Sequence, residues 1–285
     1  MSPYPDRPRM RVALLRGDDH HNLYLDSLLR REFDVVTVVS EPGLAQRRTL
    51  RRRGKWRDAI ASEYHLLRRG IMGLNRRRGR FFADARAQAS LPLPPSPHLT
   101  ITSVNDPAVA ELVRASGADV CVITCTTILS TRTIEAIGVD IINIHGGHLP
   151  DYRGCHCFFF ALSNGDFDKI GSTIHFVNAG IDTGPIVQVA RPSIEPRDDA
   201  ESLYSKAELL AAHLLRDWLA RREAGDQIPS TEQAFRGRLV LRRHRLPHHD
   251  VFFAIRRMTG ALRLPTVREG ERWEPAARAA ESADW

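Results

Sequence analysis

Two side chains that could hold a developing negative charge lie two positions apart in the segment Ile-Ile-Asn-Ile-His. Asn143 and His145 end an apolar run, and alternation along a strand would place both on one face. An amide donor beside an imidazole suits an oxygen that becomes negative when a carbonyl group is attacked. Alone, the pair is weak evidence, because polar residues commonly end strands.

A carboxylate follows in a longer pattern. The segment from Asn143 to Ile186 contains Asn-x-His, then Leu-Pro-x-Tyr-Arg-Gly, then His-x-Val-x-x-x-x-Asp-x-Gly-x-Ile with Asp182 as its acid. In this pattern the chain resembles the catalytic core of the 10-formyltetrahydrofolate-dependent formyltransferases, which include glycinamide ribonucleotide, methionyl-tRNA and nucleotide-sugar formyltransferases. The resemblance extends more weakly over residues 100–220.

The resemblance implies a mechanism without a metal ion. Asn143 and His145 would stabilise the oxyanion that forms when an amine attacks the formyl carbon. Asp182 would keep His145 protonated and position a water for proton transfer. His156 and His175 would support Asp182, although a histidine satisfied within the core is an equal alternative for each.

The same resemblance implies 10-formyltetrahydrofolate as the formyl donor. Its pterin would bind main-chain groups near Asp182, with two apolar residues as walls. The expected main-chain residues are Val177, Asn178, Ala179, Gly180 and Ile181, and the expected walls are Ile128 and Leu129.

Two loops depart from the family pattern. Glycinamide ribonucleotide enzymes bind a phosphate on a Gly-rich turn after the first strand, whereas here Asp18 and Asp19 would repel a phosphate. The loop after His145 reads Gly-Gly-His-Leu-Pro instead of the commoner Ser-Leu-Leu-Pro. We therefore expect a different acceptor, although a solvent-exposed turn is equally consistent with the first departure. The candidate acceptor-binding residues are His20, His21, Asn22, Gly147, His148 and Tyr152.

Alternating apolar and helical segments predict an α/β fold, an open Rossmann-like, mostly parallel sheet flanked by helices. The predicted strands cover residues 9–15, 33–40, 99–104, 119–125, 141–145, 171–177 and 185–190, and the last two are expected to pair with each other. Asn22 is the predicted N-cap of the first helix. Asp198, with Glu201 as its partner, is predicted to cap a long helix that ends near Gly225.

The pattern divides the chain into two parts. Residues 1–225 are predicted to form the catalytic domain, which includes a basic helical excursion at 44–97 that stops at the proline-rich run 91–97. Residues 226–285 are a short C-terminal extension of unknown role, Arg-rich and too poor in apolar residues for a core of its own.

Composition limits the class of protein. The excess of 41 Lys and Arg over 34 Asp and Glu gives a net charge of +7, which suits an anionic partner, although a solvated basic face is an equal reading of residues 47–80. No apolar run could span a bilayer and no secretory signal is visible, so we expect a soluble, cytoplasmic protein. The cysteines, expected to be buried free thiols, are Cys121, Cys125, Cys155 and Cys157.

These observations favour transfer of a formyl group to the amine of a small acceptor, with a nucleotide-linked amino sugar or a secondary-metabolite precursor as first candidates. Methionyl-tRNA is the alternative acceptor, disfavoured because residues 226–285 are too few for an RNA-gripping barrel. A nucleic-acid-binding protein on the same scaffold is a second alternative. A nucleotide-binding dehydrogenase is a third alternative, but the sequence lacks the Gly-x-Gly-x-x-Gly motif that such an enzyme needs after its first strand. The sequence does not determine the oligomeric state.

Overall fold

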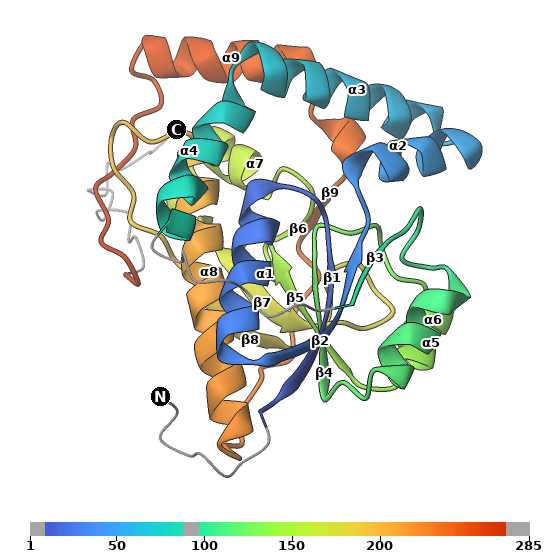
Figure 1. Cartoon of the computed structure of the whole chain (residues 1–285). Coiled ribbons are helices and arrows are strands. Elements are labelled where there is room, and N and C mark those ends of the chain that lie inside the picture. The colour runs from blue at the N-terminus through green and yellow to red at the C-terminus, as the bar shows by residue number, and fades with distance from the viewer. Residues whose placement is uncertain (1–8, 88–96, 272–285) are drawn as a thin grey trace.

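A seven-stranded sheet forms the centre of the protein in the computed structural model, which describes residues 9–87 and 97–271 (Figure 1). The strand order is β3-β2-β1-β4-β5-β7-β8. The strands are β1 (Arg11–Arg16), β2 (Asp34–Ser40), β3 (His98–Thr100), β4 (Val120–Thr124), β5 (Asp140–His145), β7 (Ser172–Phe176) and β8 (Ile186–Ala190). The first five are parallel, whereas β7 and β8 run antiparallel to their neighbours. The predicted mostly parallel sheet, and the pairing of its last two strands, are confirmed.

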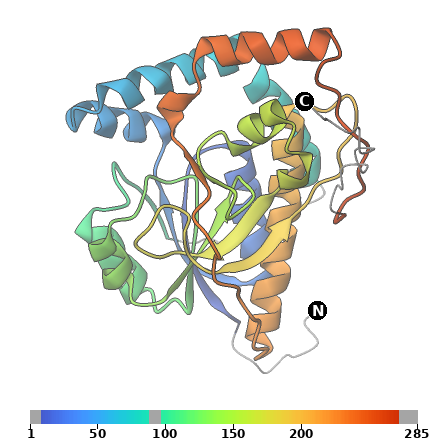
Figure 2. The ribbon, with the colours of Figure 1, turned by 180° about the vertical axis from the view of Figure 1, so that it is seen from behind.

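Helices cover both faces of this sheet. On one face lie α1 (His20–Glu32) and α8 (Ala200–Glu223), and on the other lie α5 (Pro107–Ala115) and α6 (Thr131–Ile137), as Figure 2 shows from behind. Parallel strands buried on two faces need apolar side chains on both, which explains the continuous apolar runs in the sequence.

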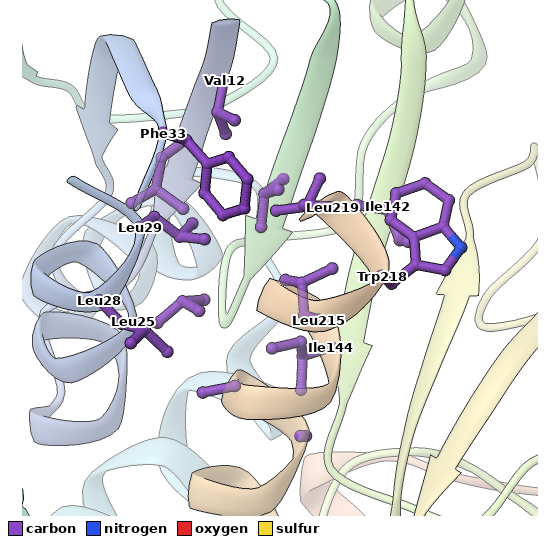
Figure 3. Close-up of a cluster of buried hydrophobic side chains, with 14 of the residues drawn as sticks. Val12, Leu25, Leu28, Leu29, Phe33, Ile142, Ile144, Leu215, Trp218 and Leu219 are labelled. Carbon is purple, nitrogen blue, oxygen red and sulfur yellow. The ribbon is translucent and has the colours of Figure 1, made fainter. Parts of the chain in front are cut away.

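Successive residues of each central strand enter different cores. Val12 and Leu14 of β1 pack with α1 and α8, in the cluster of Figure 3, whereas Ala13 and Leu15 pack with α5 and α6. In β5, Ile142 and Ile144 occupy the first cluster and Ile141 the second. Asn143 and His145 therefore point toward the α5 and α6 side, on one face as predicted.

The described part of the excursion between β2 and β3 contains three helices, α2 (Gly43–Arg52), α3 (Trp56–Ile71) and α4 (Leu74–Ala87). The prediction of helices here is confirmed, whereas most of the proline-rich run 91–97 lies outside the described residues. These helices lie above the carboxyl ends of the parallel strands (Figure 1).

The C-terminal extension packs on the rest of the protein. Its strand β9 (Arg238–Val240) pairs in parallel with the short strand β6 (Tyr152–Gly154), and a short turn, η2 (Arg242–His244), follows. Helix α9 (Pro247–Met258) is then joined to α3 by hydrogen bonds from Tyr64 and Arg68 to Asp250. Helix α7 (Cys157–Asn164) and the turn η1 (Phe167–Lys169) complete this side.

Both predicted helix caps are wrong by a few residues. Asp19, not Asn22, caps α1, because its carboxylate accepts the amide of His20, while Asn22 lies buried within the helix. Asp199 caps α8 and forms a capping box with Ser202.

The neighbouring acid Asp198 has a different role from the predicted one. It accepts hydrogen bonds from the hydroxyl of Ser202 and the amide of Glu195, which fixes the turn before α8. Asp198 adjoins the true cap and carries the same sequence signal, whereas Asn22 lies three positions after Asp19.

The third strand is shorter than predicted. Only His98–Thr100 pairs with β2, and the chain leaves the sheet before Val104, which packs beneath α5. Across the described ranges, no helix combines the length and the apolar character needed to cross a bilayer.

Candidate active site

The carboxyl ends of three adjacent parallel strands open into one cavity. Gly17 follows β1, Cys125 follows β4 and Gly146 follows β5, and all three line a cavity of about 650 Å³. This volume is typical of small-molecule sites, which in open α/β sheets lie outside the carboxyl ends of the strands. Helices α3, α4, α8 and α9 supply the other walls.

Beside this cavity the structure brings together Asn143, His145 and Asp182. The Nδ1 atom of His145 lies 3.4 Å from a carboxylate oxygen of Asp182, which also accepts the Gly154 amide at 2.9 Å. The other ring nitrogen, Nε2, donates to the carbonyl of Tyr152 at 2.9 Å. Asp182 and Tyr152 thus fix the orientation of a buried ring.

His175 joins the same cluster from β7, whose register places it opposite Asn143. Its Nδ1 donates to the carbonyl of Phe176 at 2.7 Å, so its Nε2 accepts from the Asn143 amide at 3.1 Å. That nitrogen is also 3.7 Å from Asp182. Asn143 is thereby oriented with a second N–H still available as a donor.

That Asp182 keeps His145 protonated stays a prediction. Burial lowers the pKa of His145, and the attraction of Asp182 partly opposes it. Burial would raise the pKa of Asp182, but His145 and His175 hold it well below its usual range. The two ring nitrogens of His145 face two acceptors, the Asp182 carboxylate and the Tyr152 carbonyl.

The backbone is strained around this site. Cys125, His156 and Asp182 are the non-glycine residues with positive φ in the described part of the chain, at 55°, 58° and 50°. Side chains other than glycine rarely adopt this region, and such residues gather at functional sites. Each of the three lies in the cavity wall or in the polar cluster beside it.

The predicted folate segment follows β7 and is open to solvent. Asn178, Ala179 and Gly180 are exposed, and the Asn178 side chain accepts the amide of Gly180 and the hydroxyl of Thr183. Val177 packs in the same cluster as the buried Leu129, while the side chain of Ile128 is 63% exposed. An exposed apolar side chain beside an open main-chain segment fits a flat heterocycle.

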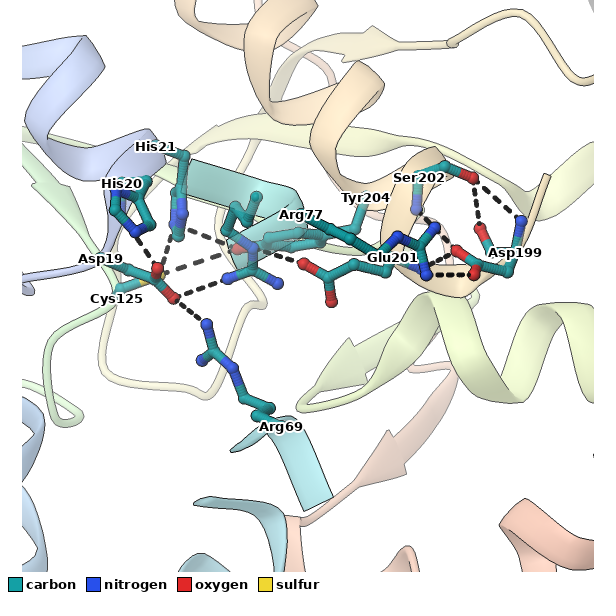
Figure 4. Close-up of polar contacts among 11 residues, drawn as sticks. Asp19, His20, His21, Arg69, Arg77, Cys125, Asp199, Glu201, Ser202 and Tyr204 are labelled. Atoms are coloured by element: carbon teal, nitrogen blue, oxygen red, sulfur yellow. Dashed lines mark hydrogen bonds and ion pairs between the residues drawn. The ribbon is translucent and has the colours of Figure 1, made fainter. Parts of the chain in front are cut away.

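The expected folate residues do not line the cavity, whereas the loop before α1 does. Arg69 and Arg78 donate to one carboxylate oxygen of Asp19 at 2.8 and 2.6 Å, and Arg78 also donates to Glu201 at 2.6 Å (Figure 4). Burial would raise the pKa of Asp19, but Arg78, His21 and Arg69 hold it well below its usual range. The predicted repulsion of a phosphate by Asp19 is therefore cancelled by two arginines.

Of the predicted acceptor-binding residues, His21 and Asn22 line the cavity. The Nε2 atom of His21 lies 3.1 Å from the hydroxyl of Tyr204 and 3.2 Å from the sulfur of Cys125. The amide nitrogen of Asn22 is buried without a hydrogen-bond partner among the described residues. This nitrogen is a donor that a ligand could use.

The remaining acceptor-binding candidates face elsewhere. The ring of His20 lies against Gly79 of α4, and His148 contacts Asp151 and Arg191. Gly147 and Tyr152 act through their carbonyls, since the first accepts from Thr173 and the second from His145. A sequence pattern cannot distinguish a loop residue that lines a cavity from one that supports it.

His156 does not contact Asp182, the residue that it was predicted to support. Its ring lies 4.2 Å from that of His65, centroid to centroid, and within the described residues it makes no hydrogen bond to Asp182. Of the predicted buried thiols, Cys121 and Cys157 are buried, whereas Cys155 is partly buried and Cys125 is exposed to the cavity.

Several cavity residues were missed by the sequence analysis. Tyr204 comes from α8, Arg69 and Arg78 come from the excursion, and Arg242 and Arg245 come from the C-terminal extension. The arginines of the basic excursion therefore fall into two groups, because Arg78 is buried in the cavity wall while others are exposed to solvent. The exposed arginines include Arg51, Arg52, Arg53, Arg57 and Arg76.

Comparison with known proteins decides the family. The formyl transferase family matches residues 10–218, which is most of the chain. The chain belongs to the formyl transferase family. The sequence resemblance is therefore confirmed, and the match covers β1 to α8.

Relatives within the formyl transferase family differ in acceptor. Methionyl-tRNA formyltransferase from Myxococcus xanthus (strain DK1622) is 33% identical over 134 residues, 47% of this chain and 43% of that protein. The matched segment thus spans less than half the length of this relative.

Solved structures show the same fold over a longer range. A sugar N-formyltransferase from Shewanella sp FDAARGOS_354 has a TM-score of 0.54 at 17% identity, covering 94% of this chain and 99% of that one. An N-formyltransferase from Helicobacter canadensis in complex with folinic acid and dTDP-3-aminofucose has a TM-score of 0.50 at 15% identity, covering 82% and 72%. These likenesses confirm the formyltransferase fold.

Proposed function

We propose that this protein transfers a formyl group from 10-formyltetrahydrofolate to the amine of a small acceptor. The observation that carries the proposal is the cluster of Asn143, His145, Asp182 and His175 at the end of β5, beside a cavity large enough for a substrate. Membership of the formyl transferase family supports the donor, since the Helicobacter relative was solved with folinic acid.

In the proposed reaction the folate supplies the formyl carbon, and this chain supplies donors for the oxygen. The free N–H of Asn143 donates to that oxygen as negative charge develops. His145 contributes its Nε2 proton by exchanging the Tyr152 carbonyl for the substrate oxygen, while Asp182 maintains the ring orientation. As the acceptor nitrogen bonds to the formyl carbon, the bond from that carbon to the folate nitrogen breaks. Asp182, ionised beforehand, receives the proton of the attacking amine through a water and passes it on to the leaving folate nitrogen.

The acceptor is proposed to be a nucleotide-linked amino sugar or a related small amine. The cavity supports this choice, because α3, α4 and α9 close over the strand ends and leave about 650 Å³. The Shewanella neighbour is a sugar N-formyltransferase, and the Helicobacter neighbour was solved with dTDP-3-aminofucose. Methionyl-tRNA is the second candidate acceptor, because the similar Myxococcus protein is a methionyl-tRNA formyltransferase.

Incubation with 10-formyltetrahydrofolate and separate acceptors tests the proposal, with product detected by mass spectrometry. The acceptors are nucleotide-linked amino sugars, amino acids and methionyl-tRNA. We expect formylation of a small amine, lost at least 100-fold in Asp182→Asn because an aligned carboxylate is removed. The exposed Asp217→Asn on α8 is the matched control. Formylation of methionyl-tRNA alone would overturn the acceptor, and unchanged rates in Asp182→Asn would overturn the mechanism.

A further inference from the structure

Three arginines, Arg68, Arg242 and Arg245, line the cavity wall formed by α3, η2 and α9. Arg68 and Arg245 both donate to Asp250, which leaves this pair one positive charge in excess. Arg242 donates to the hydroxyl of Ser62 at 3.1 Å and has no carboxylate partner within residues 9–87 and 97–271. Four charged groups therefore carry a net charge of about two positive units in this wall.

The wall around Asp19 is different. There two carboxylates, Asp19 and Glu201, face two guanidinium groups, Arg69 and Arg78, at 2.6 to 2.8 Å. These four charges cancel, so that wall offers no unpaired charge to a ligand. The wall that contains Arg242 holds an excess of positive charge that the wall around Asp19 lacks.

Burial makes this excess charge effective. Arg245 is 5% exposed, and its guanidinium lies 3.5 Å above the centre of the Phe159 ring. Burial lowers the pKa of Arg245, and the charge of Arg68 contributes to the same effect. A positive group held in a partly desolvated site gains from an anion that enters beside it.

Burial and the positive charge of these arginines lower the pKa of two histidines in the same wall, His65 and His156. Burial together with Arg245, Arg242 and Arg68 lowers the pKa of His65 to about 4. His65 is 7% exposed, and its Nδ1 lacks a hydrogen-bond partner in the described structure, as does Nε2 of His156. Because Nε2 of His65 donates to the carbonyl of Arg242, its Nδ1 is an acceptor that would take a donor group of the ligand, while the arginines take its anionic oxygens.

Backbone hydrogen bonds of two consecutive residues connect this wall to the catalytic cluster. The amide of Gly154 donates to Asp182, and the next amide, that of Cys155, donates to Val240 at 2.7 Å. Val240 ends β9, and Arg242 begins the turn that follows. His156 and Cys157 then line the cavity between the arginines and His145, whose Nε2 is 3.8 Å from the Cys157 sulfur.

We propose that Arg68, Arg242 and Arg245 form an anion subsite that binds a phosphate or carboxylate group of the acceptor. This inference rests on the proposed function, in which the amine of the same molecule lies beside His145. Guanidinium groups bind such oxygens through paired hydrogen bonds, which fixes orientation as well as charge. The acceptor is therefore an anionic amine, anchored by residues of the excursion and of the C-terminal extension.

Calorimetric titration of the full chain with inorganic pyrophosphate, and separately with malonate, tests the subsite. We expect the wild type to bind at least one of them, and Arg242→Gln to bind it at least tenfold more weakly. Arg242→Lys, which keeps the charge but not the planar fork, should fall between the two. Arg243→Gln is the matched control, because Arg243 pairs with Asp58 and does not line the cavity.

The two ligands distinguish the sources of the anion. Tighter binding of pyrophosphate would indicate that the acceptor carries a phosphate group, and tighter binding of malonate would indicate that it carries a carboxylate group. Absence of binding by the wild type at millimolar ligand, or equal affinity in Arg242→Gln, would overturn the subsite. Titration of the same variants with a reduced-folate analogue separates the two proposals, because loss of Arg242 leaves the expected folate segment intact.

Discussion

At the residue scale, Glu208 places a carboxyl group where water is excluded. It is 4% exposed on α8, accepts the hydroxyl of Ser172 at 2.7 Å and lies beside Gly146 at the cavity. Burial raises its pKa from 4.5 to about 7. The folded protein therefore holds a proton that the unfolded chain releases between these pH values.

This shift predicts how stability depends on pH. The contribution of Glu208 is present below pH 4.5 and is lost as pH rises through 7, because ionisation then favours the unfolded chain. Urea unfolding should show Glu208→Gln more stable than wild type at about pH 8, by on the order of 3 kcal/mol, and similar near pH 4.5. The exposed Glu232→Gln should match wild type at both pH values. A Glu208→Gln variant less stable at pH 8 would contradict the assignment.

The residues around Asp182 also show what sequence can predict. Asn143, His145 and Asp182 were found from their spacing, and the structure brings them together. The sequence could not reveal that Tyr152 and Asp182 occupy both nitrogens of His145. It also could not reveal that burial outweighs the carboxylate in setting the pKa of the ring, since both depend on tertiary packing.

At the element scale, the start of α8 forms part of the cavity wall. Asp199 accepts the amides of Glu201 and Ser202 and pairs with Arg77 at 2.7 Å. The cap therefore fixes Glu201, which holds Arg78 against Asp19.

Removal of the cap should cost stability. Asp199→Ala should lower the free energy of unfolding by about 1 to 2 kcal/mol, because two helix amides lose their acceptor. The exposed Asp217→Ala in the same helix, which also pairs with an arginine, should change it by less than about 0.5 kcal/mol. Denaturant unfolding of both variants measures the difference, and equal losses would show that Asp199 is not the cap.

Strands and helices were predicted well where the signal is local. Apolar runs ending in glycine or a polar pair gave β1, β2, β4 and β5, because each is buried on both faces. The short β3 was overextended, since the alternation that continues to Val104 belongs to a chain that has already left the sheet. The cap of α8 was misplaced by one residue, because Asp198 and Asp199 adjoin and both can accept a helix amide.

At the scale of the whole molecule, distant segments close over one cavity. Asp250 accepts from Tyr64 and Arg68 across more than 180 positions, and Asp19 accepts from Arg78 across 59. The sequence shows no periodicity that links these residues, so the cavity wall could not be predicted from it. The assignment of residues 226–285 as an extension separate from a 1–225 domain stays a prediction.

One contact joins the extension to the expected folate segment. The side-chain amide of Gln233 donates to the carbonyls of Asp182 and Gly184 at 3.0 and 2.8 Å. Gln233→Ala should weaken binding of a reduced-folate analogue about tenfold, because two hydrogen bonds of about 1 kcal/mol each hold the segment. Calorimetry should show Gln227→Ala, an exposed glutamine of the same extension, unchanged. Wild-type affinity in Gln233→Ala would show that the extension does not position the segment.

We expect a reduced folate to bind beside Asp182, which calorimetric titration with a stable reduced-folate analogue measures. The wild type and Asp217→Ala should both bind clearly. Asp182→Ala should bind at least tenfold more weakly, because the segment loses its hydrogen bond from Gly154 and its partner His145. Absence of binding by the wild type, or equal binding by all three proteins, would exclude a folate site beside Asp182.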